Sequence, residues 1–187
     1  MTLTCANKIT IFRILVVPFF IGTVLYYSPE KDYRRFIALG IFLIAVISDV
    51  IDGYIARTQH QKTEVGAILD PLADKLLLMS AFICLYKISV FFHLVRFPIW
   101  LVVAVMSRDV MLLLGAMVIQ MIRGKLTLEP TVWGKATTFF EILCVIGFLM
   151  QWPLSEVFWG PAFILIIISA VDYIFKGINI LNEGSLA

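Results

Sequence analysis

The feature that most constrains the fold of this chain is a succession of apolar runs, each about as long as a bilayer is thick. A helix crosses a bilayer with about 20 apolar residues, and six stretches of the 187-residue chain come close to that length. Strands are excluded because the runs are too long and lack the period-two alternation of a barrel. We therefore predict an all-α integral membrane protein, a bundle of six transmembrane helices. The predicted spans are residues 9–27, 34–56, 68–87, 97–122, 133–151 and 160–181.

The composition supports this fold class. Apolar residues make up 61% of the chain and charged residues 15%, whereas about a quarter of the residues of a soluble domain are charged. The breaks between the runs are short, which favours one compact bundle and a single domain over 1–187. The first run lacks a small-x-small cleavage site, so we expect a retained helix. With a net charge of +2 and no long basic cluster, nucleic acid is not an expected partner.

Lysine and arginine are unevenly divided between the two ends of the predicted helices. Cytoplasmic loops of membrane proteins are enriched in these residues, so the richer side is predicted to face the cytoplasm. The protein is then a multi-pass protein of the cell inner membrane with its N-terminus inside. On the poorer side, Arg34 and Arg35 are partly offset by Glu30 and Asp32. The richer side carries Lys8, Arg13, Arg57, Lys62, Lys75, Arg123, Lys125, Lys135 and Lys176. The poorer side carries Lys31, Arg34, Arg35, Lys87 and Arg96.

Four aspartates stand out in this apolar chain: Asp49 and Asp52 in the second run, Asp70 and Asp74 in the third. Spacings of three and four place each pair on one face of a helix. A carboxylate in hydrocarbon costs about 2.5 to 3.5 kcal/mol even on the lenient insertion scale, so a water-filled cavity or cation partners are required. Two Mg²⁺ or Mn²⁺ ions need several carboxylates arriving from different directions. The pattern therefore predicts a site for two divalent metal ions at the cytoplasmic ends of these helices.

The residues around the acids indicate a phosphate-bearing substrate. Gly53, Ala56 and Gly66 leave space for a close approach of substrate to the backbone. Arg57 supplies a planar fork suited to a diphosphate. Two alternatives remain: structural salt bridges to Arg57, Lys62 and Lys75, or an ion or metal transporter that uses the same acids.

The whole pattern, D-x-x-D-G-x-x-A-R-x8-G-x3-D-x3-D from Asp49 to Asp74, resembles the motif of the CDP-alcohol phosphatidyltransferase family. The segments from Asn7 to Arg13 and from Gly134 to Thr138 also resemble segments of bacterial members of the family, so the likeness spans essentially the whole chain. The resemblance implies a six-helix bundle, usually a homodimer, with a polar cavity open to the cytosol and two bound divalent metals.

The resemblance also implies a role for each motif residue. Asp49, Asp52 and Asp70 are expected to bind the metals, and Asp74 to bind metal and act as general base. Gly53, Ala56, Arg57 and Gly66 are expected to contact the cytidine diphosphate part of CDP-diacylglycerol. Thr10 and Arg13 are expected near the cytidine, although Arg13 is equally able to extend to the membrane interface. An acceptor hydroxyl then attacks the phosphate attached to diacylglycerol, and CMP leaves.

The acceptor must be recognised outside the motif. Arg108 lies deep in the fourth run, and with Lys135 it is predicted to bind the phosphate of glycerol 3-phosphate. The alternative is an internal ion pair of Arg108 with Asp109 or Glu141, although adjacent residues point about 100° apart on a helix. The sequence Ser107-Arg108-Asp109-Val110 also resembles cardiolipin synthases of the same superfamily, whose acceptor is phosphatidylglycerol. We expect glycerol 3-phosphate, with phosphatidylglycerol as the alternative.

The remaining polar residues give weaker predictions. Asp172 and Lys176 are four apart and are predicted to pair. Cys5, Cys84 and Cys144 have no ligand spacing and are expected to be buried thiols. His60 and His93 are expected in solvated loops. Trp100, Trp133, Trp152 and Trp159 are predicted to mark helix ends at the membrane interface.

Overall fold

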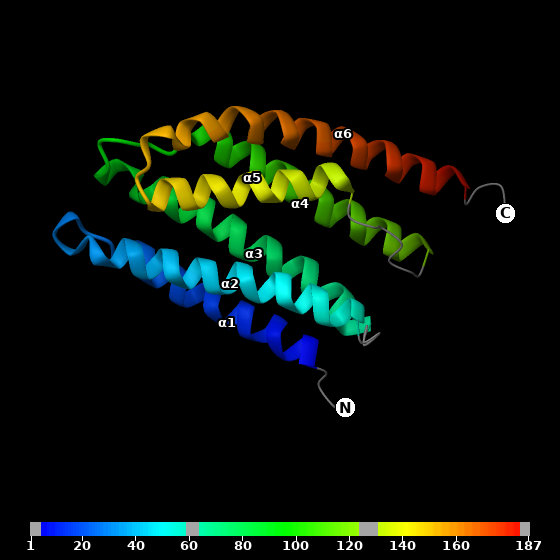
Figure 1. Ribbon diagram of the computed structural model, residues 1–187. Coiled ribbons are helices and arrows are strands. Elements are labelled where there is room, and N and C mark those ends of the chain that lie inside the picture. Colours follow the sequence, from blue (N-terminus) through cyan, green and yellow to red (C-terminus); the bar gives the residue numbers. More distant parts are fainter. Residues whose placement is uncertain (1–4, 59–63, 124–130, 184–187) are drawn as a thin grey trace. The chain divides into compact units, whose positions relative to one another are not determined.

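The computed structural model describes residues 5–58, 64–123 and 131–183, with side chains over 11–51, 75–119, 121 and 131–179. Six long helices and three short 3₁₀ turns follow one another, and these residues contain no strand (Figure 1). The prediction of an all-helical chain is confirmed, and each predicted run corresponds to one helix. The elements are α1 (Cys5–Leu25), η1 (Pro29–Lys31), α2 (Tyr33–Thr58), α3 (Glu64–Ile88), η2 (Ser89–Phe91), α4 (Ile99–Arg123), α5 (Val132–Leu149), η3 (Pro153–Phe158) and α6 (Trp159–Glu183).

The chain forms two compact units, and the first consists of Met1–Phe97 with Val145–Pro153. Within it α1 packs along both α2 and α3. Its core is apolar and aromatic: the rings of Phe20 and Phe42 lie 5.9 Å apart, and the ring of Phe148 meets those of Phe92 and Phe97 edge-on at 5.3 Å. Such edge-on pairs add to the stabilisation that comes from burial itself. This unit carries all four motif aspartates.

The second unit consists of Pro98–Cys144 with Leu154–Ala187. Here α4 packs along α6, and the ring of Trp100 meets that of Phe163 edge-on at 5.3 Å. Apolar side chains such as Leu101 and Val105 are fully buried. The unit differs from an ordinary apolar core because it also buries a set of polar side chains: Arg108, Asp109, Thr131, Thr137, Glu141, Ser155 and Ser169.

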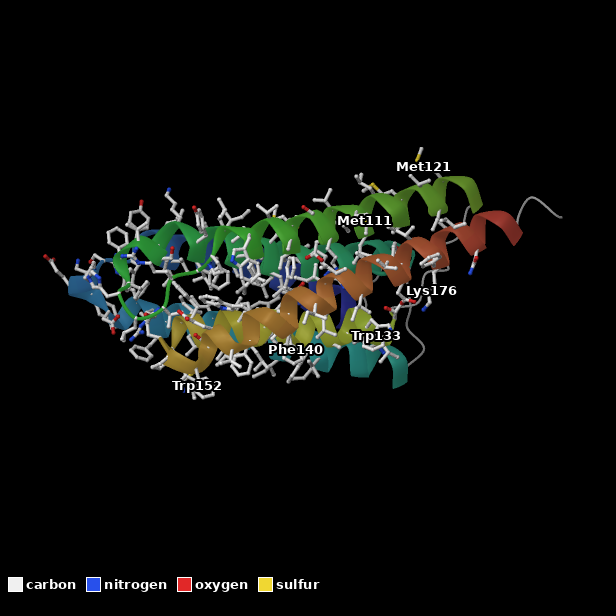
Figure 2. All side chains as sticks on the ribbon, turned by 90° about the horizontal axis from the view of Figure 1, so that it is seen from above. Met111, Met121, Trp133, Phe140, Trp152 and Lys176 are labelled. Carbon is white, nitrogen blue, oxygen red and sulfur yellow. The ribbon has the colours of Figure 1, made fainter. Side chains whose placement is uncertain are left out.

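Apolar surface confirms a membrane protein. Over the described residues, three segments are long and apolar enough to cross a bilayer: Ile99–Ile119, Val132–Leu149 and Pro153–Asn179. A shorter apolar stretch covers Ile11–Leu25. Met121 is 87% exposed and projects from α4 (Figure 2), an exposure that costs free energy in water and none in lipid. That all six helices cross the membrane stays a prediction.

Tryptophans lie at the helix ends, as predicted. Trp100 and Trp133 are the second residues of α4 and α5, Trp159 is the first of α6, and Trp152 follows the end of α5. Figure 2 shows Trp133 and Trp152 toward the two ends of α5. These positions match an anchoring belt at the two membrane interfaces. The predicted burial of cysteine is confirmed for Cys84 and Cys144, whereas Cys5 lies outside the described side chains.

The end of α5 has a defined local cause. Gln151 adopts φ 51°, the left-handed conformation that commonly stops a helix. The Trp152 N–H then donates to the Gly147 carbonyl at 3.0 Å, which satisfies a carbonyl of the last turn. Pro153 follows directly and prevents the helix from continuing.

The turn between α1 and α2 confirms the predicted charge offset for Arg35 and Asp32. The Arg35 guanidinium donates to Asp32 at 2.9 Å, and the Tyr27 hydroxyl donates to the same carboxylate at 3.1 Å. The Tyr27 ring stacks on Phe92 with the centroids 4.9 Å apart. Burial first, and then the neighbouring Asp32 carboxylate, raise the pKa of Tyr27 above its ordinary value. The turn is thereby fixed on the core of the first unit.

Candidate functional site

The two halves of the acidic motif occupy consecutive helix ends in the first unit. Asp49 and Asp52 lie in the last turns of α2, which ends at Thr58, and Asp70 and Asp74 lie in the first turns of α3. Each pair therefore has the predicted helical spacing. Gly53, Ala56 and Arg57 also lie on α2 and Gly66 on α3, whereas Thr10 lies on α1. The side chains from Asp52 to Asp74, and that of Thr10, lie outside the described ones, so their convergence stays a prediction.

Asp49 is held by a buried arginine from α1. Arg13 Nη2 lies 2.8 Å from Asp49 Oδ1; the arginine side chain is 1% exposed and the carboxylate 44%. The alternative that Arg13 extends to the membrane interface is therefore wrong, because its charged end turns inward to an acid on the neighbouring helix. The motif alone does not reveal this contact. The Asp49 side chain stays partly accessible although its cation partner is buried.

The donor set fits divalent metal ions. Asp49 has accessible carboxylate surface beyond its contact with Arg13, and both motif helices pack along α1. Oxygen ligands from carboxylates are what Mg²⁺ and Mn²⁺ prefer. The described side chains contain no group of three metal-binding residues, since three of the four predicted ligands are outside that set. Asp49, Asp52, Asp70 and Asp74 are the residues that would hold the ions.

The second unit contains a separate buried charge centre on α4. Arg108 Nη1 lies 2.7 Å from Asp109 Oδ1, with the two side chains 3% and 0% exposed. Arg108 Nη2 donates to Ser169 Oγ on α6 at 2.9 Å. The expectation that adjacent positions disfavour this pair is wrong, because the long arginine stem bends around the helix and overcomes the 100° separation. Among the described residues, Arg108 thus bonds Asp109 and Ser169 rather than the alternative partner Glu141.

The N-terminus of α5 faces this arginine. Thr131 caps the helix, since its Oγ1 accepts the Gly134 N–H at 3.0 Å. A Cβ added to Gly134 would lie 3.5 Å from Arg108 Nη2, 3.3 Å from Thr131 Oγ1 and 3.8 Å from Ser169 Oγ. Glycine therefore lets the first turn of α5 approach the guanidinium. Lys135, the other predicted acceptor ligand, is exposed on the same turn.

Hydrogen bonds to α6 fix α5 and α4 around this centre. The Thr137 hydroxyl is positioned at 2.8 Å from the Trp133 carbonyl and 3.1 Å from the Leu165 carbonyl of α6. The Tyr173 hydroxyl donates to the Leu112 carbonyl of α4 at 3.3 Å. Both hydroxyls thus form a hydrogen bond from their own helix to a carbonyl of a neighbouring helix. The centre is thereby built by three helices rather than by one.

Sequence reasoning missed Ser169 and Thr131. A lone serine in a transmembrane helix usually bonds its own backbone, as Ser107 does to the Val103 carbonyl at 2.7 Å. A signal was available for Thr131, because a threonine directly before an apolar run is a helix N-cap pattern. The predicted Asp172–Lys176 pair is confirmed, with Nζ and Oδ2 3.8 Å apart.

The fold and these centres define an all-helical membrane protein with a motif of four acids in one unit and a buried arginine in the other. Comparison with known proteins supplies the family: the family model described as CDP-alcohol phosphatidyltransferase matches residues 3–175. The chain belongs to the CDP-alcohol phosphatidyltransferase family. It is therefore an enzyme of phospholipid biosynthesis that transfers a substituted phosphate group, and its family generally uses divalent metal ions.

Three relatives illustrate the range of the likeness. A CDP-diacylglycerol--glycerol-3-phosphate 3-phosphatidyltransferase of Aquifex aeolicus is 33% identical over 183 residues, 94% of this chain and 96% of the relative. A probable phosphatidylglycerophosphate synthase of Mycobacterium tuberculosis is 32% identical over 182 residues, 93% of this chain and 81% of the relative. A cardiolipin synthase (CMP-forming) of Oryza sativa subsp. japonica is 35% identical over 112 residues, 58% of this chain and 33% of the relative.

Proposed function

We propose that the chain transfers the phosphatidyl group of CDP-diacylglycerol to glycerol 3-phosphate, releasing CMP and forming phosphatidylglycerophosphate. The complete motif on α2 and α3 supports the donor half of the reaction. The acceptor half is supported by relatives named for glycerol 3-phosphate that align over nearly the whole chain. The observation that carries the acceptor assignment is the buried Arg108 beside the N-terminus of α5, because both features favour a phosphate.

The donor is held by residues of the first unit. Asp49, Asp52, Asp70 and Asp74 would hold two divalent cations, Mg²⁺ or Mn²⁺. When bound, such ions neutralise the charge that develops on the phosphate oxygens. Gly53, Ala56, Arg57, Gly66 and Thr10 contact the cytidine diphosphate part of CDP-diacylglycerol.

Asp74 is the proposed general base. It takes the proton from the acceptor hydroxyl, whose oxygen attacks the phosphorus attached to diacylglycerol. The bond from that phosphorus to the oxygen of the CMP part then breaks, and Arg57 stabilises the charge on the departing CMP. The residues of this chain thus orient the substrates, accept one proton and bind the leaving group.

Arg108 and Lys135 bind the phosphate of the acceptor. Arg108 carries five N–H donors, and among the described residues its Nε has no hydrogen-bond acceptor. An arginine whose side chain is 3% exposed and that retains an unused donor gains from a ligand oxygen. Lys135 adds a second positive charge on the first turn of α5.

The same proposal covers the assembly and its location. The chain forms a single domain over 1–187, folded as a bundle of six transmembrane helices. It is a multi-pass protein of the cell inner membrane, with its active site facing the cytoplasm, and it assembles as a homodimer. The bias of lysine and arginine supports this orientation.

A second candidate is a cardiolipin synthase, with phosphatidylglycerol as the acceptor. The sequence at the buried Arg108–Asp109 pair resembles that of cardiolipin synthases and favours this candidate. The relative from Oryza sativa supports it as well. Ion or metal transport through the same acids is the third candidate, and a flux in proteoliposomes that is independent of CDP-diacylglycerol would support it.

The test is CMP release by purified protein with CDP-diacylglycerol, Mg²⁺ or Mn²⁺, and one acceptor at a time. We expect CMP with glycerol 3-phosphate and none with phosphatidylglycerol. The reverse pattern would assign the chain to cardiolipin synthesis. No CMP with either acceptor would contradict the proposed transfer reaction, and a CDP-diacylglycerol-independent flux in proteoliposomes would then support ion or metal transport.

Replacement of the proposed base gives a mutational test of the same function. Asp74→Asn is expected to lower kcat by about 10²- to 10⁴-fold, the usual contribution of a general base, while Mn²⁺ binding persists through the other carboxylates. Asp172→Asn is the matched control, because Asp172 only pairs with Lys176. Turnover by Asp74→Asn at the wild-type rate would remove Asp74 as the base.

A further inference from the structure

One contact in the second unit links a third helix to the acceptor site. Ser169 on α6 is 2% exposed, and its Oγ accepts a hydrogen bond from Arg108 Nη2 at 2.9 Å across 61 positions of sequence. Nothing in the reaction as described uses this hydroxyl. Its hydrogen bond to the guanidinium of the proposed phosphate ligand suits it to orient that guanidinium.

The guanidinium is planar, so two contacts at different nitrogens fix its orientation. Asp109 holds Nη1 from α4, and Ser169 holds Nη2 from α6. The Nε position has no acceptor among the described residues. Asp109 alone fixes one nitrogen and leaves the plane able to turn about that contact. Ser169 supplies the second point of attachment.

The direction of the fixed plane matters because α5 begins beside it. The site of a Cβ on Gly134 lies 3.5 Å from Arg108 Nη2 and 3.8 Å from Ser169 Oγ. The first turn of a helix favours an anion through its N–H groups and its dipole. One N–H of Nη2 is bonded to Ser169, and the second N–H of this nitrogen remains for a ligand oxygen beside that turn.

We propose that Ser169 is a positioning residue for the acceptor phosphate: it holds the Arg108 guanidinium so that the unused donors face the start of α5. This inference rests on the proposed function, since it assumes that Arg108 binds the acceptor phosphate. Ser169 acts through Arg108 and does not need to touch the substrate.

A purely structural role of Ser169 would be to tie α6 to α4. The structure supplies a control for that role, because the Tyr173 hydroxyl also bonds α6 to α4, at the Leu112 carbonyl 3.3 Å away. Tyr173→Phe removes a hydrogen bond between the same two helices and leaves both hydrogen bonds of Arg108 in place. Ser107→Ala removes a serine next to Arg108 that bonds only its own helix.

The experiment measures kcat and KM for both substrates with purified full-length protein, CDP-diacylglycerol and metal. Ser169→Ala is expected to raise KM for glycerol 3-phosphate about tenfold, the size of one hydrogen bond to a charged group. KM for CDP-diacylglycerol should stay within about twofold, because the donor binds in the other unit. Ser169→Thr keeps the hydroxyl and should restore KM. Tyr173→Phe and Ser107→Ala should leave both constants near those of the wild type.

Binding of glycerol 3-phosphate by calorimetry, without the donor, gives a readout independent of turnover.

If Ser169→Ala does not yield folded protein, Ser169→Cys provides the second variant. It keeps about the volume of the side chain but offers Arg108 a weaker hydrogen-bond acceptor, and it should give a smaller rise in KM. An unchanged KM in Ser169→Ala, or an equal rise in Tyr173→Phe, would overturn the positioning role alone. Wild-type protein that releases no CMP with glycerol 3-phosphate would instead overturn the proposed function.

Discussion

Both units bury an arginine against an aspartate, but the two pairs are built in opposite ways. In the first unit Arg13 is 1% exposed while the Asp49 side chain is 44% exposed, and the partners come from two helices. In the second unit Asp109 is fully buried and Arg108 is its immediate neighbour on α4. In the first unit the acid is the accessible partner. In the second unit both partners are buried, and Arg108 retains an unused Nε donor.

This difference separates two kinds of chemistry. A carboxylate supported from behind by a buried cation presents an anionic oxygen to a metal. A guanidinium supported by a buried carboxylate presents donors to a phosphate. The same pair of residue types therefore serves the metal side of the proposed reaction in one unit and the acceptor side in the other. In the first unit the exposed acid is the partner able to take a ligand, and in the second unit it is the buried arginine with an unused Nε donor.

The largest expected effect comes from breaking the buried pair of the second unit. Asp109→Asn leaves the Arg108 charge in a dry environment without its counter-ion, and loss of one partner of a buried pair typically costs about 3 to 5 kcal/mol. Thermal unfolding in detergent should therefore begin at a distinctly lower temperature than in the wild type. An unchanged transition would show that Arg108 is not dependent on Asp109.

A double variant separates stability from function in the same unit. Arg108→Met with Asp109→Leu replaces both charges by apolar side chains of similar size, which is often neutral for stability. We expect recovery of the unfolding temperature and continued loss of glycerol 3-phosphate binding. Recovery of binding as well would contradict the assignment of Arg108 to the acceptor phosphate.

A smaller effect is expected from the pair of the first unit. Arg13→Gln removes the cation that holds Asp49, and loss of such a supporting contact commonly lowers metal affinity by about tenfold or more. Arg13→Lys should fall between the variant and the wild type, because a lysine keeps the charge and loses the planar fork. Mn²⁺ binding measured by paramagnetic resonance checks the order. Equal or tighter binding in Arg13→Gln would contradict a supporting role.

The exposed pair on α6 gives the baseline for both comparisons. Lys176 and Asp172 side chains are 49% and 28% exposed, and their charged atoms are 3.8 Å apart. Exposed pairs at this spacing contribute about 0.3 to 0.5 kcal/mol. Lys176→Ala should therefore leave the unfolding temperature nearly unchanged and kcat within about twofold. A large loss of kcat would assign the pair to the active site.

The helices and the motif were predictable from the sequence because their signals are local. Apolar run length predicted each helix, and the spacing of Asp49 and Asp52 placed both on α2. The contact of Arg13 with Asp49 was not predictable, since it depends on how α1 is rotated against α2. A membrane helix is apolar on most of its faces, so the periodicity of its apolar residues does not show which face packs against the next helix.

Arg108 shows a second limit of sequence reasoning. Its burial was expected from its depth in the apolar run, but its partners were misjudged. Backbone geometry separates neighbouring side chains, whereas the flexible arginine stem brings its head group back to Asp109 at 2.7 Å. Ser169 gave no local signal, because its contact with Arg108 spans 61 positions.

The buried Arg13 also bears on how the protein enters the membrane. Its guanidinium lies near the middle of α1, whose apolar stretch over Ile11–Leu25 is shorter than the three full spans. A central arginine opposes partitioning of an isolated helix by about 2.5 to 3.5 kcal/mol. In the proposed six-span bundle, α1 would therefore be a poor stand-alone insertion signal until Asp49 emerges on α2 to neutralise Arg13. The ion pair would then favour co-translational entry of α1 and α2 as one hairpin.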